Sequence, residues 1–279
     1  MKTKRIIARL DIKNDALVKG VHLEGFRVLG DPGSFAKIYY EDGIDEIVYM
    51  DVVASLYGRN GLIDLIKKTA KEIFIPLTVG GGIRSIDDVA ALLAAGADKV
   101  CINTAAVKRP KLITEVVNVY GSSALVIAVE AIKVDDVYMV FTDNGREHTG
   151  LKVSEWVKKI EELGAGEILL TSVDREGTGK GIDIELLEEV RNSVSISIVV
   201  HGGVGSVGDV YNTFKNLRVD ALCIASLFHY NTIHSNVPLN KSIMGNKSFL
   251  LSNKERSGIK AVSVKHLKEE LRIQKVRVR

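Results

Sequence analysis

The sequence is poor in cysteine, proline and aromatic residues, and each shortage excludes a class of protein. It contains 2 Cys, 4 Pro and 6% aromatic residues among 279. Cys101 and Cys223 each lie in an apolar run with no second cysteine or histidine close by, so neither a disulfide framework nor a zinc site is expected. The few prolines and the lack of a Gly-X-Y period exclude a fibrous protein, and 46% apolar residues exclude a disordered one.

Long hydrophobic runs are also missing, and neither sign of charge dominates. No apolar stretch reaches the roughly 18 residues that a membrane span requires, and Arg9, Asp11 and Lys13 interrupt any signal-peptide core. We therefore expect a soluble, cytoplasmic protein with no membrane partner. A net charge of +3 is too small to indicate nucleic acid as a partner. No cluster of His, Cys and acidic residues has ligand spacing, so neither a metal nor an organic cofactor is predicted.

Short apolar, β-branched runs recur along the chain, and an amphipathic segment follows each of them. Their near-continuous hydrophobicity is typical of parallel strands that are buried on both faces. The candidate strands are 5–11, 46–51, 75–79, 99–103, 124–129, 167–171, 196–201 and 221–225. Candidate helices include 85–95 and 153–163, with Gly96 and Gly164 placed to end them. Eight such units predict an α/β protein that forms one (β/α)8 TIM barrel over residues 1–279.

The second half of the sequence repeats the first at an offset of about 121 residues, as repeated structural units do. The matching segments are 45–51 with 166–172, 81–89 with 202–210, and 98–104 with 220–226. The repeat predicts a barrel that is built from two half-barrels of four βα units each.

Two glycine turns occupy matching places in the halves, Gly81-Gly82 after the third strand and Gly202-Gly203 after the seventh. Glycine lets a backbone approach an anion closely, and the N-terminus of the helix that follows favours negative charge. Thr104 or Ser226 ends the next strand of each half with a hydroxyl group. A single turn of this kind could be structural, but the symmetric pair predicts two phosphate sites on opposite sides of the barrel mouth.

Carboxylates end the first strand of each half, Asp11 in the first and Glu130 in the second. Burying a carboxylate is costly, so each must face the mouth or be paired. Two carboxylates at one mouth suit a general acid and a general base. The alternative is that one or both only hold a loop through N–H bonds.

Charged residues also stand at or near the starts of four candidate strands. These residues are Arg5, Glu46, Lys99 and Glu167. The starts of parallel strands meet at the bottom of a barrel, so these charges alone favour a stabilising ring of ion pairs that plugs it.

The motifs that carry these residues resemble the cyclase subunit of imidazole glycerol phosphate synthase. The resemblance extends from residue 5 to about residue 228, and again over 262–279. It is most specific in Leu10-Asp11-Ile12-Lys13, in Thr78-Val79-Gly80-Gly81-Gly82-Ile83-Arg84-Ser85 and in Asp174-Arg175-Glu176-Gly177-Thr178.

The resemblance implies a barrel that binds a bisphosphorylated ribulosyl-formimino aminoimidazole carboxamide ribonucleotide and works in histidine biosynthesis. A glutaminase subunit would dock at the bottom, forming a heterodimer, and would release ammonia that crosses the barrel. The ammonia would cleave and cyclise the substrate to imidazole glycerol phosphate and an aminoimidazole carboxamide ribonucleotide. The four charges at the bottom would then form a gate rather than a plug, and Asp98 would touch the partner.

The resemblance also implies roles for residues at the mouth. Asp11 and Glu130 would be the catalytic pair. The residues implied to bind substrate and its phosphates are Lys19, Gly81, Gly82, Asn103, Thr104, Glu176, Gly177, Gly202, Gly203, Ala225 and Ser226.

The chain departs from the family pattern at several positions near the mouth. Glu130 and Glu176 stand where Asp is usual, and Arg9 replaces a Cys. Arg9 shares the parity of Asp11, so it should point inward, where it would either add a positive charge or pair with Glu130. His201, at a position that is often Ser, is either an added phosphate donor or a structural residue. A polar insertion over 229–261 is predicted to follow the eighth strand on the catalytic face, as a lid or a partner surface.

These departures leave a second hypothesis open. A paralogous subunit could direct glutaminase-derived ammonia to a nucleotide-linked sugar in surface-polysaccharide synthesis. Two further alternatives are a scaffold that only stimulates a glutaminase and a simple isomerase of the related pathway barrel. The presence of Asp11 argues against the scaffold, and the charges at the bottom argue against the isomerase.

Overall fold

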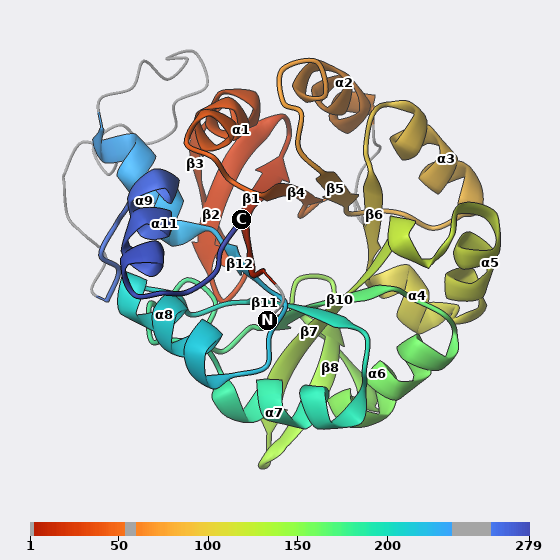
Figure 1. The fold of residues 1–279 in the computed structure, drawn as a ribbon. Coiled ribbons are helices and arrows are strands. Elements are labelled where there is room, and N and C mark those ends of the chain that lie inside the picture. The colour runs from red at the N-terminus through yellow and green to blue at the C-terminus, as the bar shows by residue number, and fades with distance from the viewer. Residues whose placement is uncertain (1–2, 54–59, 236–257) are drawn as a thin grey trace.

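The computed structural model describes residues 3–53, 60–235 and 258–279. Over these residues the chain forms a closed barrel of parallel strands inside a ring of helices (Figure 1). The barrel strands are β1 (Arg5–Lys13), β4 (Glu46–Asp51), β5 (Leu77–Gly80), β6 (Lys99–Ile102), β7 (Leu125–Val134), β10 (Glu167–Ser172), β11 (Ser197–His201) and β12 (Ala221–Ile224). Pairing of β12 with β1 and of β7 with β10 closes the cylinder. The predicted (β/α)8 barrel is confirmed.

Each barrel strand lies within a few residues of its predicted position, because continuous burial on both faces leaves an unbroken apolar run. The largest shift of a strand start is at β5, which was expected from residue 75 and begins at Leu77; the largest shift of a strand end is at β7, which was expected to end at residue 129 and continues to Val134. Pro76 has no N–H to donate to a ladder, although its carbonyl oxygen still accepts a hydrogen bond from Ile47.

Helices connect the strands and cover the outside of the barrel. The helices in the described residues are α1 (Pro32–Glu41), α2 (Asn60–Thr69), α3 (Ile86–Ala94), α4 (Thr104–Lys108), α5 (Lys111–Tyr120), η1 (Ser122–Ala124), α6 (Val153–Glu162), α7 (Ile184–Ser193), α8 (Val207–Asn216), α9 (Ser226–His234) and α11 (Val264–Ile273). Gly96 and Gly164 follow the ends of α3 and α6 with φ of 115° and 94°, the left-handed conformation expected there.

The two half-barrels match in detail at the starts of their third helices. Helix α3 begins with a capping box between Ser85 and Asp88, and α8 begins with the same arrangement between Ser206 and Asp209. In both boxes the serine hydroxyl accepts an N–H bond while the aspartate accepts one from the serine backbone. Equivalent helix caps at repeated positions support the prediction that the barrel is built from two half-barrels.

Two β-hairpins were not predicted, and they too follow the repeat. Strand β1 continues into β2 (Ala16–Val21) and β3 (Glu24–Gly30), and β7 continues into β8 (Val137–Thr142) and β9 (Glu147–Lys152). The two-residue turns Asn14-Asp15 and Asp135-Asp136 have positive φ throughout, as the tight hairpin turn requires. Each hairpin therefore rises from the first strand of its half, beside the barrel mouth.

Apolar side chains fill two separate regions. The larger core lies between the strands and the helices, and a smaller one lies inside the barrel. The interior core consists of Ile7, Val48, Cys101, Val126, Ala128, Leu169, Val199, Ala221 and Cys223, with Met50 packed against it. Burial of one large aliphatic side chain stabilises the folded state by roughly 1.5–3 kcal/mol. The barrel interior is thus a packed apolar core, and charged groups lie above and below it.

The predicted insertion begins too early. Residues 229–234 belong to helix α9, and His229 is fully buried against the ring of Tyr39, whose hydroxyl lies 2.7 Å from His229 Nδ1. Their polar side chains suggested a loop, but His229 and Thr232 are buried and Asn231 and His234 are half-buried. Of the remainder of the insertion, residues 236–257 lie outside the described residues. Within the described segments, no helix has both the length and the apolar character needed to cross a membrane.

Candidate active site

The catalytic pair expected from the sequence lies at the C-terminal ends of β1 and β7. Asp11 is 1% exposed and Glu130 is 8% exposed. Each sits where its strand leaves the barrel and enters a hairpin, so the two halves supply one carboxylate each to the same end of the barrel. In a (β/α)8 barrel this is the end at which catalytic groups gather.

Glu130 lies in surroundings that favour its neutral form. Its Oε2 accepts a 2.8 Å hydrogen bond from the backbone N–H of Gly145, at the tip of the β8–β9 hairpin. Burial raises the pKa of Glu130 to about 7, although the bonds from Gly145 and Asn103 and the nearby charge of Arg9 act to lower it. A carboxyl group with this pKa can both donate and accept a proton near neutral pH.

Asp11 is held by a buried ion pair. Arg9 points into the barrel, as predicted; it pairs with Asp11 and not with Glu130, which was one of the two alternatives given for it. Arg9 Nε donates to Asp11 Oδ1 at 2.8 Å, because side chains two residues apart on β1 share a face, and Arg9 Nη1 lies 3.4 Å from the hydroxyl of Thr171 on β10. Burial opposes the charge of Arg9, but Asp11 outweighs it and raises the pKa of the guanidinium above its usual value.

The residues expected at the first phosphate site line one cavity of about 390 Å³. They are Gly81, Gly82, Asn103 and Thr104, and Glu130 lines the same cavity. A Cβ on Gly81 would lie 2.3 Å from the carbonyl oxygen of Asp51, so only glycine fits this close approach. Asp143, from the tip of the β8–β9 hairpin, also lines the cavity, and its carboxylate is 3.5 Å from the Thr104 hydroxyl.

The residues expected at the second phosphate site follow strands β10, β11 and β12 but are covered. Gly202, Gly203, Ala225 and Ser226 are buried. A Cβ on Gly203 would lie 2.0 Å from the carbonyl oxygen of Gly181, which shows how closely the loop after β10 packs over the turn. The residues expected at the first phosphate site therefore line an open cavity, whereas the glycine turn expected at the second phosphate site lies under a loop.

Asn103 and Ala225 occupy equivalent places in the two halves. They precede α4 and α9 with φ, ψ of −121°, −90° and −122°, −77°, outside the regular helix and strand regions. Neither residue makes a side-chain cap hydrogen bond to its helix. The backbone thus presents Thr104 and Ser226 in the same way on the two sides of the barrel.

Lys19 and Glu176 form a buried ion pair, so both residues contact each other rather than solvent. The second carboxylate oxygen of Glu176 accepts a 3.0 Å bond from the N–H of Leu23, and the Lys19 ammonium also donates to the carbonyl of Gly20 at 2.9 Å. Burial alone would raise the pKa of Glu176, but Lys19 and these bonds lower it to about 2. Gly177 packs against Gly20 and Val21 of the same hairpin.

His201 lies inside the barrel and is 3% exposed. Its Nδ1 donates to the carbonyl oxygen of Cys223 at 2.8 Å, which fixes the tautomer that carries its proton on Nδ1. Burial and the charge of Arg9 lower its pKa to about 4. The two hypotheses for His201 were an added phosphate donor and a structural residue, and these contacts support the structural role.

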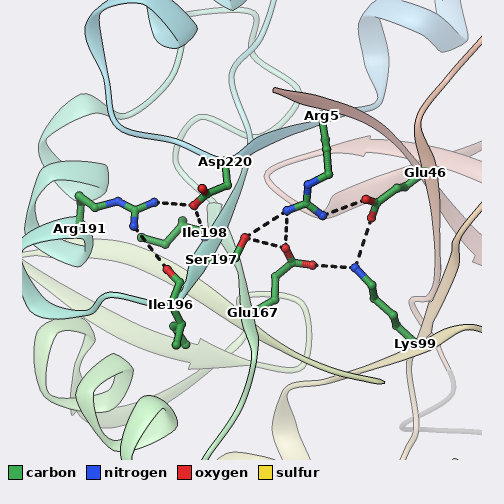
Figure 2. Close-up of polar contacts among 9 residues, drawn as sticks. All are labelled: Arg5, Glu46, Lys99, Glu167, Arg191, Ile196, Ser197, Ile198 and Asp220. Carbon is green, nitrogen blue, oxygen red and sulfur yellow. Dashed lines mark hydrogen bonds and ion pairs between the residues drawn. The ribbon is translucent and has the colours of Figure 1, made fainter. Parts of the chain in front are cut away.

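The charges at the starts of the strands form a ring at the bottom of the barrel (Figure 2). Arg5 donates to Glu46 at 2.9 Å and to Glu167 at 2.5 Å. Lys99 completes the ring at 3.4 Å from Glu46 and 3.2 Å from Glu167. Burial acts to raise the pKa of Glu167, but its bonds to the two cations lower it overall. The ring predicted from the sequence is present.

Sequence reasoning missed one member of this ring. The Ser197 hydroxyl donates to Glu167 at 2.8 Å and accepts from Arg5 at 3.1 Å. Its place at the start of β11, level with the other members, was the available signal. Asp98 is exposed beside Lys99, and its carboxylate accepts a 2.8 Å bond from the N–H of Leu77.

No three His, Cys, Asp or Glu side chains in the part of the chain that the structure describes come together in a group that could hold a metal ion. The fold defines the chain as a (β/α)8-barrel protein, with two strand-end carboxylates at one end of the barrel.

Comparisons with known proteins narrow this class. Residues 5–234 match the family described as histidine biosynthesis protein, and the chain belongs to this family. Three relatives are each named imidazole glycerol phosphate synthase subunit HisF. The Legionella pneumophila protein is 55% identical over 208 residues, which cover 74% of this chain and 98% of the relative. The Lactococcus lactis subsp. lactis protein is 50% identical (82% and 90% covered), and the Sulfurisphaera tokodaii protein is 48% identical (84% and 93%).

Proposed function

We propose that the chain is the cyclase subunit of imidazole glycerol phosphate synthase, acting in histidine biosynthesis. The names of relatives about half identical over most of the chain support this function. The observation that carries it in the structure is the pair of carboxylates, Asp11 and Glu130, at one barrel mouth, with Glu130 lining a cavity of about 390 Å³ that also contains the glycine turn Gly81-Gly82.

The proposed substrate is the bisphosphorylated ribulosyl compound named above, with one phosphate at each side of the mouth. The first phosphate would bind Gly81, Gly82, Asn103 and Thr104. The second would bind at Gly177, Gly202, Gly203, Ala225 and Ser226, with Lys19 and Glu176 closing over it. Since the second set is covered, the β2–β3 hairpin and the loop after β10 must move for substrate to enter. The equivalent backbone before α4 and α9 supports this two-ended arrangement.

The acid pair divides the proton transfers. Ammonia attacks the ribulosyl part of the substrate, and Asp11 accepts a proton from the attacking nitrogen. Glu130, protonated up to a pH of about 7, donates a proton to the departing aminoimidazole nitrogen. The different surroundings of the two carboxylates support these roles.

The partner that we propose is a glutaminase subunit, docked on the bottom face of the barrel in a heterodimer. The relatives are named as subunits, which supports a complex of this kind. Ammonia would enter through the ring of Arg5, Glu46, Lys99 and Glu167, and Asp98 is exposed where the partner would sit. We place the reaction in the cytoplasm, since the two buried cysteines are free thiols, as suits a reducing compartment.

A direct assay tests this function. The purified chain is mixed with ammonium and the bisphosphorylated substrate, and loss of substrate absorbance is followed. We expect turnover that Asp11→Asn lowers by about 10²–10⁴-fold. Asp15→Asn, which changes an exposed acid in the hairpin turn, should leave the rate unchanged.

Absence of turnover by the unchanged chain, with substrate binding intact, would refute the cyclase function. Ammonia would then have another acceptor, and transfer to a nucleotide-linked sugar would be assayed next. Turnover that survives Asp11→Asn would instead refute the assignment of Asp11.

A further inference from the structure

The proposed function leaves a buried charge beneath the mouth without a role. Arg9 is 2% exposed inside the barrel, two residues before Asp11 on β1. Its Nε contacts Asp11 on its own strand, and its Nη1 approaches Thr171 on β10. In the strand order β10-β11-β12-β1, two strands separate these partners, so the side chain extends across the interior beneath the mouth.

Burial of a guanidinium is costly and is tolerated only with a partner. Asp11 is the residue that forms an ion pair with Arg9. Glu176, whose charge also acts on Arg9, is already paired with Lys19. The guanidinium of Arg9 and the carboxylate of Asp11 therefore neutralise each other.

The other titratable groups that face this pair carry no charge that could replace Arg9. Burial raises the pKa of the Cys101 thiol on β6 to about 12, and burial also raises that of Cys223 on β12. His201 on β11 is neutral because its pKa lies near 4. Glu130 on β7 has a pKa near 7 and becomes negative above it, so it cannot supply a positive charge.

The contact with Arg9 leaves the two oxygens of Asp11 unequal. Oδ1 accepts from Arg9, whereas Oδ2 has no hydrogen-bond partner among the described residues. An unpaired buried carboxylate oxygen is costly and is well placed to accept a proton or an N–H bond. One oxygen is thus fixed, and the other is available.

We propose that Arg9 is a positioning residue that fixes Asp11 through Oδ1, so that the free Oδ2 accepts the proton removed from the attacking ammonia. This inference rests on the proposed function. The proton moves from the ammonia nitrogen to Oδ2, and Arg9 keeps its own protons throughout. The charge of Arg9, at a position where the family pattern has Cys, makes Asp11 the proton acceptor and leaves proton donation to Glu130.

Kinetics of Arg9→Met and Arg9→Lys test the proposal, with Arg272→Met as the matched control. Arg272 is exposed in the last turn of α11 and donates to the carbonyl of Arg279 at 3.2 Å, near the start of β1 and away from the mouth, so its loss should change nothing in the assay. We expect Arg9→Met to lower kcat by roughly a hundredfold, because Asp11 loses its fixed geometry, with KM for the substrate little changed. In a plot of kcat against pH, the decline on the acidic side should move to higher pH in Arg9→Met. It should stay in place in Arg9→Lys.

A measurement independent of turnover keeps the two proposals apart. Carboxyl carbons of aspartate are labelled with ¹³C, the Asp11 signal is assigned from its loss in Asp11→Asn, and its shift is followed against pH. The signal should respond to pH differently in Arg9→Met than in the unchanged chain, because the cation that contacts Oδ1 has been removed. Failure of the unchanged chain to turn over would refute the function but not this result.

Two outcomes would overturn the role of Arg9. One is a folded Arg9→Met variant with unchanged kcat, acidic decline and Asp11 signal. The other is an Arg9→Lys variant whose acidic decline and Asp11 signal move away from those of the unchanged chain despite its retained charge. If Arg9→Met does not fold, Arg9→Lys decides the question alone, because it keeps the charge while losing the guanidinium geometry.

Discussion

At the scale of single residues, the two carboxylates show how surroundings assign roles to similar groups. Asp11 contacts a permanent cation, whereas Glu130 contacts a backbone N–H at the tip of a hairpin. Burial favours the neutral form of Glu130, whereas Asp11 is held in an ion pair with Arg9.

The pKa of Glu130 predicts a pH dependence. Burial raises the pKa of Glu130 to about 7, so the protonated form of Glu130 persists up to that pH. The ammonia-dependent kcat should therefore fall as the pH rises through 7. The rate is measured at a constant concentration of neutral ammonia, so that its own ionisation does not contribute. Glu130→Gln should lower kcat by about 10²–10⁴-fold and remove this limb. The exposed Glu162→Gln should do neither, and a profile without a limb near pH 7 in the unchanged chain would contradict the role.

At the scale of elements, the hairpins after β1 and β7 place groups on the barrel mouth that the eight strands alone do not provide. The first hairpin carries Lys19 to Glu176. The second brings Gly145 to Glu130, and its neighbour Asn144 donates to the carbonyl of Val52 at 2.7 Å. Both hairpins therefore fasten one side of the mouth to the other.

Removing the charge of Glu176 should loosen the first hairpin. Glu176→Gln leaves the buried Lys19 without its partner, which costs about 3–5 kcal/mol in free energy of unfolding. Hydrogen exchange of amides in 16–30 should quicken as well. Glu162→Gln, at an exposed pair with Lys159, should change stability by at most about 1 kcal/mol. Equal effects of the two variants would show that the ion pair does not hold the hairpin.

The same pair predicts an acid dependence. The pKa of Glu176 is lowered from 4.5 to about 2, so its contribution to stability is complete above pH 4.5 and is lost as pH falls towards 2. Chemical denaturation across this range should show a steeper loss of stability in the unchanged chain than in Glu176→Gln. Parallel curves would contradict the pairing.

The sequence predicted those parts of the molecule that depend on continuous burial or on the repeat. The barrel strands were found because both of their faces are apolar, and the glycine turns and strand-end acids were found because they repeat. The hairpins were missed because β9 and the first half of β3 are largely exposed, and because the turns Asn14-Asp15, His22-Leu23 and Asp135-Asp136 lack glycine. The signal that was available and overlooked is Asn144-Gly145, between β8 and β9. The contacts of Arg9, Ser197 and Gly145 could not be predicted, since each depends on which strand or loop lies opposite in space.

At the scale of the whole molecule, charged and apolar layers alternate along the barrel interior. The bottom ring takes Arg5, Glu46 and Lys99 from the first half and Glu167 from the second. The apolar interior core lies above it, and the buried Arg9 and the two carboxylates follow at the mouth. The ring thus joins the two half-barrels at the end of the molecule opposite the proposed chemistry.

Arg5 should contribute most to this ring. It contacts Glu46, Glu167 and Ser197 at 2.5–3.1 Å, whereas Lys99 contacts only the two glutamates of the ring, at 3.2–3.4 Å. Arg5→Met leaves two largely buried glutamates facing one lysine, which should lower the free energy of unfolding by about 3–5 kcal/mol. Lys99→Met should cost less, because its contacts are longer and its side chain is more exposed.

Denaturant unfolding of both variants measures this difference, and Arg109→Met, at an exposed pair, should cost at most about 1 kcal/mol. Because Arg5 and Glu167 contact each other, the loss in Arg5→Met with Glu167→Gln should be smaller than the sum of the single losses. Additive losses, or a larger effect of Lys99→Met, would show that Arg5 does not hold the ring together. The two half-barrels would then be joined at this end by strand pairing and apolar packing alone.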